Sequence, residues 1–212
     1  MSAARNVLIT GASGGLGGAV VDAFMASGAH VTAVSHPDYD LTKSADAARA
    51  VTAAGSPLHT LVHLVGGFAG GTSVAETGDA TWRSMLTLNL DAAFYTLRAA
   101  IPAMLAHPGG RIVLIGSRNA VVPAANLAAY NVAKAGVVAL SRTVALEIGS
   151  HGATCNVVLP SVIDTPANRA AMPKADPAKW VQPSAIAALI HWLASPAAAD
   201  INGAVIPIYG QS

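Results

Sequence analysis

The stretch "NVLITGASGGLGGAVVDAF", residues 6–24, places an apolar run, a glycine-rich turn and a helical pattern in direct succession. Glycines let backbone N–H groups approach a pyrophosphate without clashes from Cβ atoms, and the N-terminus of the following helix presents unpaired N–H groups to the same anion. This order favours a dinucleotide ligand. The spacing Gly11-x-x-x-Gly15-x-Gly17 differs from the G-x-G-x-x-G fingerprint, so a turn that only packs the helix against the strand remains an alternative.

Short apolar runs of strand type recur along the whole chain, at 6–10, 30–34, 58–65, 111–117, 153–160 and 204–210. Helical spacing appears between most of them, at 15–27, 81–106 and 130–149. This alternation predicts an α/β fold: a single-domain, doubly wound parallel sheet of the Rossmann type that spans residues 1–212. Segment 35–57 has room for only one helix, at about 42–54, so we expect a shortened βα unit after the second strand.

The composition excludes several classes of partner. Twelve Lys and Arg against eleven Asp and Glu give a net charge of +1, and no basic run of the kind that nucleic acid selects is present. No apolar stretch reaches the roughly 18–20 residues of a membrane helix, and the N-terminus lacks a signal-peptide pattern, so we expect a cytoplasmic protein. Hydrophobic content of 53% with only 11% charged residues predicts helix faces buried against other subunits, hence a homo-oligomer.

Histidine and cysteine do not point to a metal site. Cys155 is the only cysteine, and its apolar neighbours favour a buried thiol over a nucleophile. His59 and His63 come nearest to ligand spacing, but strand alternation places both on one face among apolar residues. We therefore expect no bound metal.

A tyrosine and a lysine stand four residues apart in "AAYNVAKAG", residues 128–136. Residues with this spacing share one face of a helix, where the ammonium of Lys134 can stabilise a developing phenolate on Tyr130. Tyrosine has a reference pKa of about 10, so it needs such help to exchange protons near neutral pH. A half-buried aromatic ring covered by a lysine stem is the alternative interpretation.

Taken together, the motifs Thr10-Gly11-x-x-x-Gly15-x-Gly17, Asn89, Ser117 and Tyr130-x-x-x-Lys134 resemble, in type and chain order, the short-chain dehydrogenase/reductase family. The resemblance covers nearly the whole chain. It implies that Tyr130 is the acid in carbonyl reduction or the base in alcohol oxidation, and that Lys134 tunes it and binds the nicotinamide ribose. It further implies that Ser117 holds the carbonyl oxygen and that Asn89 anchors a water in a proton relay. A strand-end cap at Ser117 and a helix-interior polar residue at Asn89 are the alternatives.

The resemblance also implies contacts with a nicotinamide dinucleotide. They fall on Thr10, Gly11, Ser13, Gly15, Leu16, Gly17, Ser35, His36, Asp40, Leu41, Val65, Gly66, Gly67, Tyr130, Lys134, Pro160, Ile163 and Thr165. Residues 161–183 follow a strand and lack strong periodicity, which is typical of a cover over the carboxyl ends of strands. We expect this segment to be the substrate lid over a compact carbonyl or alcohol substrate, unless it is a surface loop with Trp180 in the core.

Two segments, "VGGFAGG" (65–71) and "DTPANRAAMPKADPAKW" (164–180), resemble the dihydropteridine-reductase subgroup of this family. That subgroup lacks the family serine and asparagine that this chain keeps at Ser117 and Asn89, and it has an acidic residue where this chain has Ser35. We therefore interpret the likeness as structural kinship and expect carbonyl/alcohol redox chemistry. Quinonoid dihydropteridine reduction is the first alternative, and a regulator that senses a dinucleotide without chemistry is the second.

The choice of cofactor depends on the end of the second predicted strand. Ser35 stands where an acidic residue would bind the ribose 2′-hydroxyl of NAD, and His36 can add positive charge. No Arg or Lys at 12–16 or 34–37 clamps a 2′-phosphate, and Asp38 is close enough to serve NAD. The balance favours NADP(H) over NAD(H) by a small margin.

The family resemblance implies a tetramer, with a dimer as the alternative, through the helices near 81–106 and 130–149. The residues expected at the subunit contacts are Leu86, Leu90, Phe94, Val138 and Val144.

Overall fold

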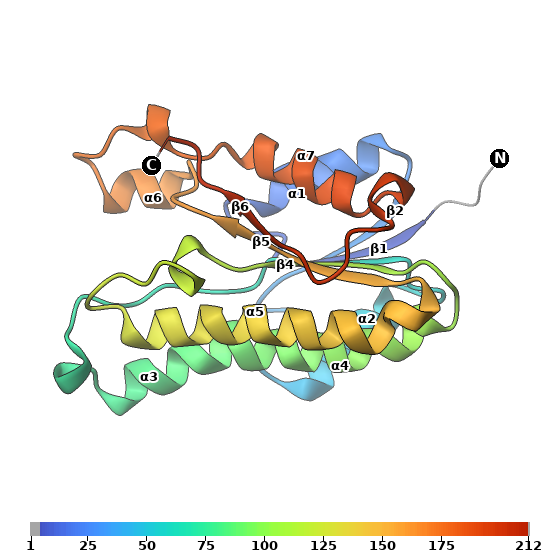
Figure 1. The fold of residues 1–212 in the computed structure, drawn as a ribbon, viewed down its shortest axis with the longest axis horizontal. Helices are drawn as coiled ribbons and strands as arrows, with labels where there is room; N and C mark the ends of the chain where they lie inside the picture. The colour runs from blue at the N-terminus through green and yellow to red at the C-terminus, as the bar shows by residue number, and fades with distance from the viewer. Residues whose placement is uncertain (1–4, 212) are drawn as a thin grey trace.

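The computed structural model describes residues 5–211 and contains one parallel sheet of six strands in the order β2-β1-β3-β4-β5-β6 (Figure 1). The strands are β1 (Asn6–Thr10), β2 (His30–Val34), β3 (Thr60–His63), β4 (Arg111–Ile115), β5 (Thr154–Pro160) and β6 (Val205–Ile208). Thr10 at the end of β1 pairs with Val34 on one side and with His63 on the other. The strand order therefore reverses between β1 and β3, which is where open α/β sheets bind ligands, at the carboxyl ends of the strands.

Helices cover both faces of the sheet. Helices α1 (Gly17–Ala26) and α7 (Pro183–Leu193) lie on one face, above the sheet in Figure 1, and α2 (Ser44–Ala53), α4 (Ala92–Leu105) and α5 (Ala128–Ile148) lie on the other. The remaining α-helices are α3 (Asp79–Leu86) and α6 (Pro166–Ala171). The short helical turns are η1 (Val74–Glu76), the π-helical η2 (Thr87–Asp91), η3 (Arg118–Ala120), η4 (Gly149–His151), η5 (Pro177–Lys179) and η6 (Pro196–Ala198).

Strand alternation divides the hydrophobic core into two layers. Leu8 and Leu61 pack under α2, α4 and α5, whereas their neighbours Ile9 and Val62 pack under α1 and α7. Because both faces of every central strand are covered, these strands are apolar almost without interruption, as the sequence indicated. The predicted Rossmann-type sheet and the six strands are confirmed. No helix among residues 5–211 is long and apolar enough to cross a membrane.

The shortened unit after the second strand is also present. Only α2 lies between β2 and β3, and residues 35–43 form turns in place of a further helix and strand. β2 is consequently an edge strand of the sheet. The structure differs from the sequence analysis in the predicted helix at 81–106, which is divided into α3, η2 and α4 because the π turn accommodates the side-chain contacts of Asn89 described below.

One assignment of helix faces was wrong. Val138 and Val144, which we expected at subunit contacts, are buried in the protomer's own core because this side of α5 packs onto the sheet. The apolar side chains that α4 and α5 leave exposed include Phe94, Val132 and Leu146, the last with 87% of its surface accessible. These residues, rather than the two valines, are the ones available to a second subunit. Cys155 is buried as predicted, and burial raises its pKa to about 12.

Candidate active site

A cavity of about 570 Å³ opens at the carboxyl ends of β3, β4 and β5. In Figure 1 this is the side of the sheet on which α6 and the N-terminal end of α5 lie. The cavity is lined by Leu64, Gly66, Gly67, Phe68, Ile115, Gly116, Ser117, Arg118, Asn119, Tyr130, Lys134, Pro160, Ser161, Val162, Ile163, Asn168, Ala171 and Met172. Residues far apart in the sequence thus meet at the edge where ligands of such sheets bind.

The glycine turn joins β1 to α1 beside this cavity. Gly11 adopts a positive φ of +71°, and its N–H donates to the carbonyl of Val34 at 2.9 Å. A Cβ atom at Gly17 would lie 2.1 Å from the carbonyl oxygen of Ala12, so only glycine allows this close packing of the helix start on the turn. The Oγ of Ser35 accepts a hydrogen bond from the N–H of Ser13 at 2.8 Å, which ties the end of β2 to the turn.

Tyr130 and Lys134 lie on one face of α5 and both line the cavity. The Nζ atom of Lys134 is 5.9 Å from the centre of the Tyr130 ring and donates to the carbonyl of Ile115 at 3.1 Å. Only 5% of the Lys134 surface is accessible, and among the described residues no carboxylate pairs with it. Burial therefore lowers the pKa of Lys134 to about 8.

The side chain of Ser117, which follows β4, lies near the Tyr130 hydroxyl. Burial raises the pKa of Tyr130, and the nearby Ser117 side chain acts in the opposite direction. Burial is the larger of the two effects, so the pKa of Tyr130 lies above its usual value. The Lys134 ammonium is therefore not the dominant influence on this pKa, contrary to the expectation from the sequence. Tyr130 is consequently a protonated phenol near neutral pH, the form that can act as an acid.

Asn89 lies behind the cavity wall rather than in it. Its side chain is 1% accessible, accepts from the Gly67 N–H at 3.1 Å and donates to the carbonyls of Gly67 and Met85 at 3.1 and 3.0 Å. A Cβ atom at Gly66 would lie 2.7 Å from Asn89 Oδ1 and 3.0 Å from Lys134 Nζ. Gly66 thus lets the side chains from η2 and α5 approach each other, while Asn89 holds the chain that leaves β3. Its water-anchoring role stays a prediction.

The structure gathers only part of the predicted cofactor contacts at the cavity: Gly66, Gly67, Tyr130, Lys134, Pro160 and Ile163 line it. Thr165 lies against the glycine turn, where a Cβ atom at Gly15 would be 2.6 Å from its methyl group. Asp40 and Leu41 lie outside the cavity lining: the Asp40 carboxylate binds Thr42 and Lys43, and the Leu41 side chain is buried in the core. Their contact with the adenine stays a prediction.

Thr10 has a partner that the sequence did not indicate. Its hydroxyl is 3.0 Å from Nδ1 of the buried His63, whose Nε2 has no partner among the described residues. Burial, with a smaller contribution from the charge of Lys134, lowers the pKa of His63 to about 3. His63 is therefore a neutral core residue below Lys134, which agrees with its expected place among apolar neighbours.

Sequence reasoning did not name Phe68, Arg118, Asn119 and Asn168 among the site residues, although all four line the cavity. Phe68 lies edge-on to the Tyr130 ring, with 5.0 Å between the ring centres. Arg118 and Asn119 follow Ser117 directly, and the Nδ2 of Asn119 donates to Asn131 at 3.2 Å. The fourth residue is Asn168 in the expected lid. Adjacency to the predicted residues Gly67 and Ser117 was the signal that could have identified the first three.

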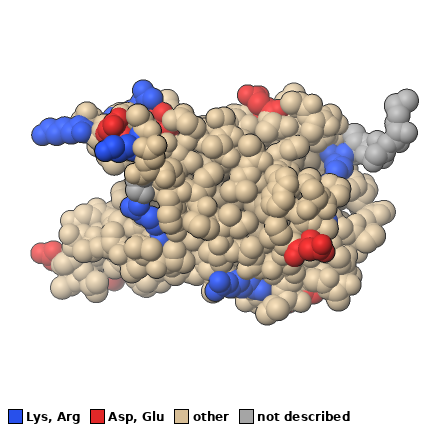
Figure 2. Space-filling view, turned by 45° about the horizontal axis from the view of Figure 1, so that its top comes forward, with Lys and Arg blue, Asp and Glu red and all other residues tan. Residues whose placement is uncertain are grey.

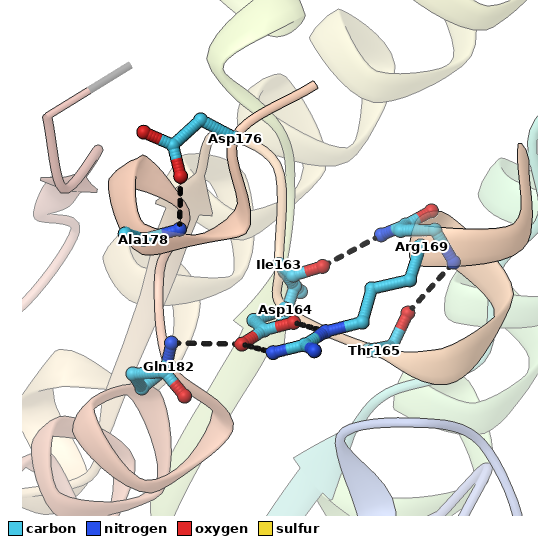
Figure 3. A network of polar contacts seen from close by, with 8 residues as sticks. Ile163, Asp164, Thr165, Arg169, Asp176, Ala178 and Gln182 are labelled. Carbon is cyan, nitrogen blue, oxygen red and sulfur yellow. Dashed lines mark hydrogen bonds and ion pairs between the residues drawn. The ribbon is translucent and has the colours of Figure 1, made fainter. Parts of the chain in front are cut away.

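Six residues from the first half of the segment expected to be the lid line the cavity: Ser161, Val162, Ile163, Asn168, Ala171 and Met172. Figure 3 shows how a polar network holds it: the Asp164 carboxylate accepts from Arg169 at 2.6 and 2.8 Å and from Gln182 at 3.0 Å. These hydrogen bonds lower the pKa of Asp164 to about 2. Trp180 is buried, as the alternative interpretation supposed, and lies outside the cavity lining. Opening and closing of the segment stay a prediction.

Comparison with known proteins gives matches that cover most or nearly all of the chain. A family model described as Enoyl-(Acyl carrier protein) reductase matches residues 37–210. A crystal structure titled as an oxidoreductase of the short-chain dehydrogenase/reductase family, from Burkholderia thailandensis, superposes with a TM-score of 0.88 at 31% identity and covers 99% of this chain and 92% of its own. The chain belongs to the short-chain dehydrogenase/reductase family.

Two curated relatives illustrate the range of this family. The 3-oxoacyl-(acyl-carrier-protein) reductase MabA of Mycobacterium tuberculosis is 33% identical over 228 positions, which cover 97% of this chain and 92% of MabA. The D-threitol dehydrogenase of Mycolicibacterium smegmatis is 32% identical over 236 positions, covering 96% of this chain and 90% of the relative. The chain is therefore an enzyme of a family whose members use NAD(P)(H). These two relatives do not favour the dihydropteridine-reductase subgroup.

The geometry fits such a cofactor. The packed turn at Gly11 and Gly17 brings backbone close to where a pyrophosphate would lie. The buried ammonium of Lys134 lines the cavity, and no carboxylate within residues 5–211 pairs with it. A buried cation in this state is costly, and ribose hydroxyls are suitable acceptors for its remaining N–H groups. A side chain at position 17 would prevent the close packing of the glycine turn, and an acid paired with Lys134 would occupy the N–H groups that could bind the ribose. Either change would remove the fit to a dinucleotide.

Proposed function

We propose that this enzyme transfers a hydride between NAD(P)(H) and a carbonyl or alcohol substrate, with Tyr130 as the acid or base. The observation that carries the proposal is the convergence of Ser117, Tyr130 and Lys134 in one cavity, where the Ser117 side chain lies near the Tyr130 hydroxyl and Lys134 Nζ is 5.9 Å from the Tyr130 ring centre. The glycine turn, Lys134 and Ile163 would hold the cofactor at the same edge of the sheet.

Reduction adds a hydride to the carbonyl carbon and a proton to its oxygen; the hydride would come from a reduced nicotinamide cofactor held at this edge of the sheet, which would be oxidised in turn. Ser117 holds the carbonyl oxygen beside the Tyr130 hydroxyl through its own hydroxyl group. Tyr130 donates its proton to that oxygen as negative charge develops there. Lys134 then stabilises the resulting phenolate, because its ammonium is fixed on the same helix face and bound to the Ile115 carbonyl. In alcohol oxidation the proton moves in the reverse direction.

The test of this mechanism is the variant Tyr130→Phe, which removes the proposed proton donor and keeps the ring. Loss of one general acid lowers the rate by about a hundredfold or more, so we expect at least that fall in kcat on any active ketone, aldehyde or quinonoid pterin. Oxidation of the reduced cofactor is followed by its absorbance across a substrate panel. Near-normal turnover by Tyr130→Phe would overturn the proposed role, and no turnover of any carbonyl by the wild type would overturn the function itself.

For the cofactor we propose a small preference for NADP(H). The Ser35 hydroxyl lies at the glycine turn through its contact with Ser13, so a hydrogen-bond donor stands where an acid would repel a 2′-phosphate. Steady-state kinetics with both reduced cofactors test this preference. A KM for NADH well below that for NADPH, with the difference abolished in Asp38→Ala, would reverse the assignment.

Quinonoid dihydropteridine reduction is the second candidate. The observation that favours it is Phe68, whose exposed ring lies edge-on to Tyr130 at the cavity and offers a surface on which a planar heterocycle could stack. The same panel decides between the two. Turnover of the pterin with little turnover of simple ketones would favour this candidate.

We further propose that the enzyme is a homo-oligomer, a tetramer or a dimer, and that it is cytoplasmic. Support for the oligomer comes from the exposed apolar side chains Phe94, Val132 and Leu146 on α4 and α5 and from the low charge content, which is visible on the face drawn in Figure 2. Cell fractionation tests the location.

A further inference from the structure

One aromatic side chain of the cavity has no part in the mechanism above. Phe68 lies in the segment that leaves β3, and its ring meets the Tyr130 ring edge-on with 5.0 Å between the ring centres. With 67% of its surface accessible, Phe68 is the most exposed of the three Phe and three Trp side chains of the protein. An apolar ring left open beside the proposed acid is a surface for a ligand rather than a part of the core.

The backbone on both sides of Phe68 is held in place. Before it, the Gly67 N–H donates to Asn89 Oδ1 and the Gly67 carbonyl accepts from Asn89 Nδ2, both at 3.1 Å. After it, the Gly71 N–H donates to the Asn126 carbonyl at 2.8 Å. The backbone that presents the ring is therefore already fixed, and a ligand that packs on Phe68 has little further backbone to order.

Phe68 is close enough to contact a group bonded to the reacting carbonyl. The oxygen that takes the proton of Tyr130 lies about 2.7 Å from the phenol oxygen, and the carbonyl carbon is about 1.2 Å further away. Aromatic pairs are favourable with ring centres about 4.5–7 Å apart. Since Phe68 and Tyr130 are 5.0 Å apart and both line the cavity, a ring attached directly to the carbonyl carbon comes within this range of Phe68.

Other side chains of the cavity suit a flat apolar group. Ile115, Val162 and Met172 line it, and Met172 is exposed. A thioether adapts to the shape of its neighbours and makes favourable contacts with aromatic rings. No acidic side chain of residues 5–211 lines the cavity, so nothing there selects a basic group on the ligand.

On these contacts, and resting on the proposed function, we propose that the substrate is an aryl ketone or aryl aldehyde, or the corresponding alcohol, with its ring attached directly to the reacting carbon and packed against Phe68. Phe68 is then a specificity-determining residue. The reaction is the one given above: the carbonyl carbon gains a hydride, and the oxygen gains the proton of Tyr130. The assignment differs from quinonoid pterin reduction, in which the reducible bond is part of the ring itself.

The experiment compares acetophenone with cyclohexyl methyl ketone, because the two have nearly the same size and differ in whether the ring is aromatic. Wild type, Phe68→Leu and Phe68→Tyr reduce both ketones with saturating reduced cofactor. We expect the acetophenone-to-cyclohexyl ratio of kcat/KM to fall by about twofold to tenfold in Phe68→Leu, mainly through KM, and to stay near the wild-type value in Phe68→Tyr. Trp192→Leu removes an exposed aromatic ring from α7, outside the cavity lining, and should leave the ratio unchanged.

Other roles of Phe68 predict a different result. If the ring packs on the cofactor or on a second subunit, Phe68→Leu changes the turnover of both ketones alike and the ratio stays constant, which overturns the proposal. A wild type that reduces aliphatic ketones but no aryl ketone also overturns it, while the proposed function stands.

A binding measurement reads recognition apart from turnover. Both ketones are titrated, with detection by ligand-observed NMR, into wild type and Phe68→Leu in excess oxidised cofactor, so that no reduction occurs. Acetophenone that binds about twofold to tenfold tighter to the wild type than to the variant, with no such difference for cyclohexyl methyl ketone, supports the proposal even where the wild type reduces no carbonyl. Equal or absent binding of acetophenone to the two proteins overturns it.

Discussion

Replacing Lys134 with methionine should stabilise the protein at pH 7 while it removes activity. Only 5% of the Lys134 surface is accessible, its Nζ donates to the Ile115 carbonyl, and burial lowers its pKa from 10.5 to about 8. Such a group is retained for chemistry at the expense of stability. Methionine is a flexible side chain of comparable length that fills the same space without a charge.

The size of the effect follows from proton linkage. Between pH 8 and 10.5 the unfolded chain binds the lysine proton and the folded one does not, so the wild type becomes more stable as the pH rises through this window. Below pH 8 the buried charge lowers the free energy of unfolding by about 3 kcal/mol, and above pH 10.5 this destabilisation is absent. Loss of the hydrogen bond to Ile115 removes about 1 kcal/mol, so Lys134→Met should gain about 2 kcal/mol at pH 7 and roughly nothing at pH 10.

Urea unfolding of the cofactor-free proteins at pH 7 and pH 10 measures this difference, at equal protomer concentration because an oligomer's apparent stability depends on it. Lys174→Met, at an exposed position, is the matched control and should show no pH-dependent gain. A gain of Lys134→Met that is the same at both pH values, or a loss of stability at pH 7, would refute the argument from the buried charge.

Three further expectations come from packing. Gly66→Ala should lower kcat/KM by about tenfold or more in a folded protein, since the new Cβ would displace Asn89 or Lys134. The control Gly78→Ala, whose new Cβ would have no atom within 4 Å, should leave kcat/KM unchanged, and steady-state kinetics compare the two variants. Light scattering at micromolar protomer concentration should give a mass above 21.2 kDa, and a monomeric mass would contradict the oligomer. The buried Cys155 should react with a thiol reagent only after unfolding, and fast labelling of the native enzyme would show that α5 opens locally.

Local patterns of the sequence were sufficient for the framework of this protein. An apolar run, a glycine turn and a helical pattern are properties of neighbouring residues, so β1, the turn at Gly11 and Gly17, and α1 could be located from residues 6–24 alone. The same holds for the single helix between β2 and β3, and for Tyr130 and Lys134, because helix periodicity places residues four apart on one face.

Tertiary structure decided what surrounds those residues. The partner of Asn89 is Gly67, 22 residues earlier, and the low pKa of Lys134 depends on its burial under the end of β4, which no local pattern encodes. Periodicity predicts an apolar face on α5 but does not show whether the sheet or another subunit packs against it. Val138 was therefore assigned to a subunit contact, although it is buried in the core of the protomer. Arg118 lines the cavity only because β4 ends beside β5 and α5. The burial of a residue and the charge around it depend on all of its spatial neighbours, and only the fold brings these neighbours together.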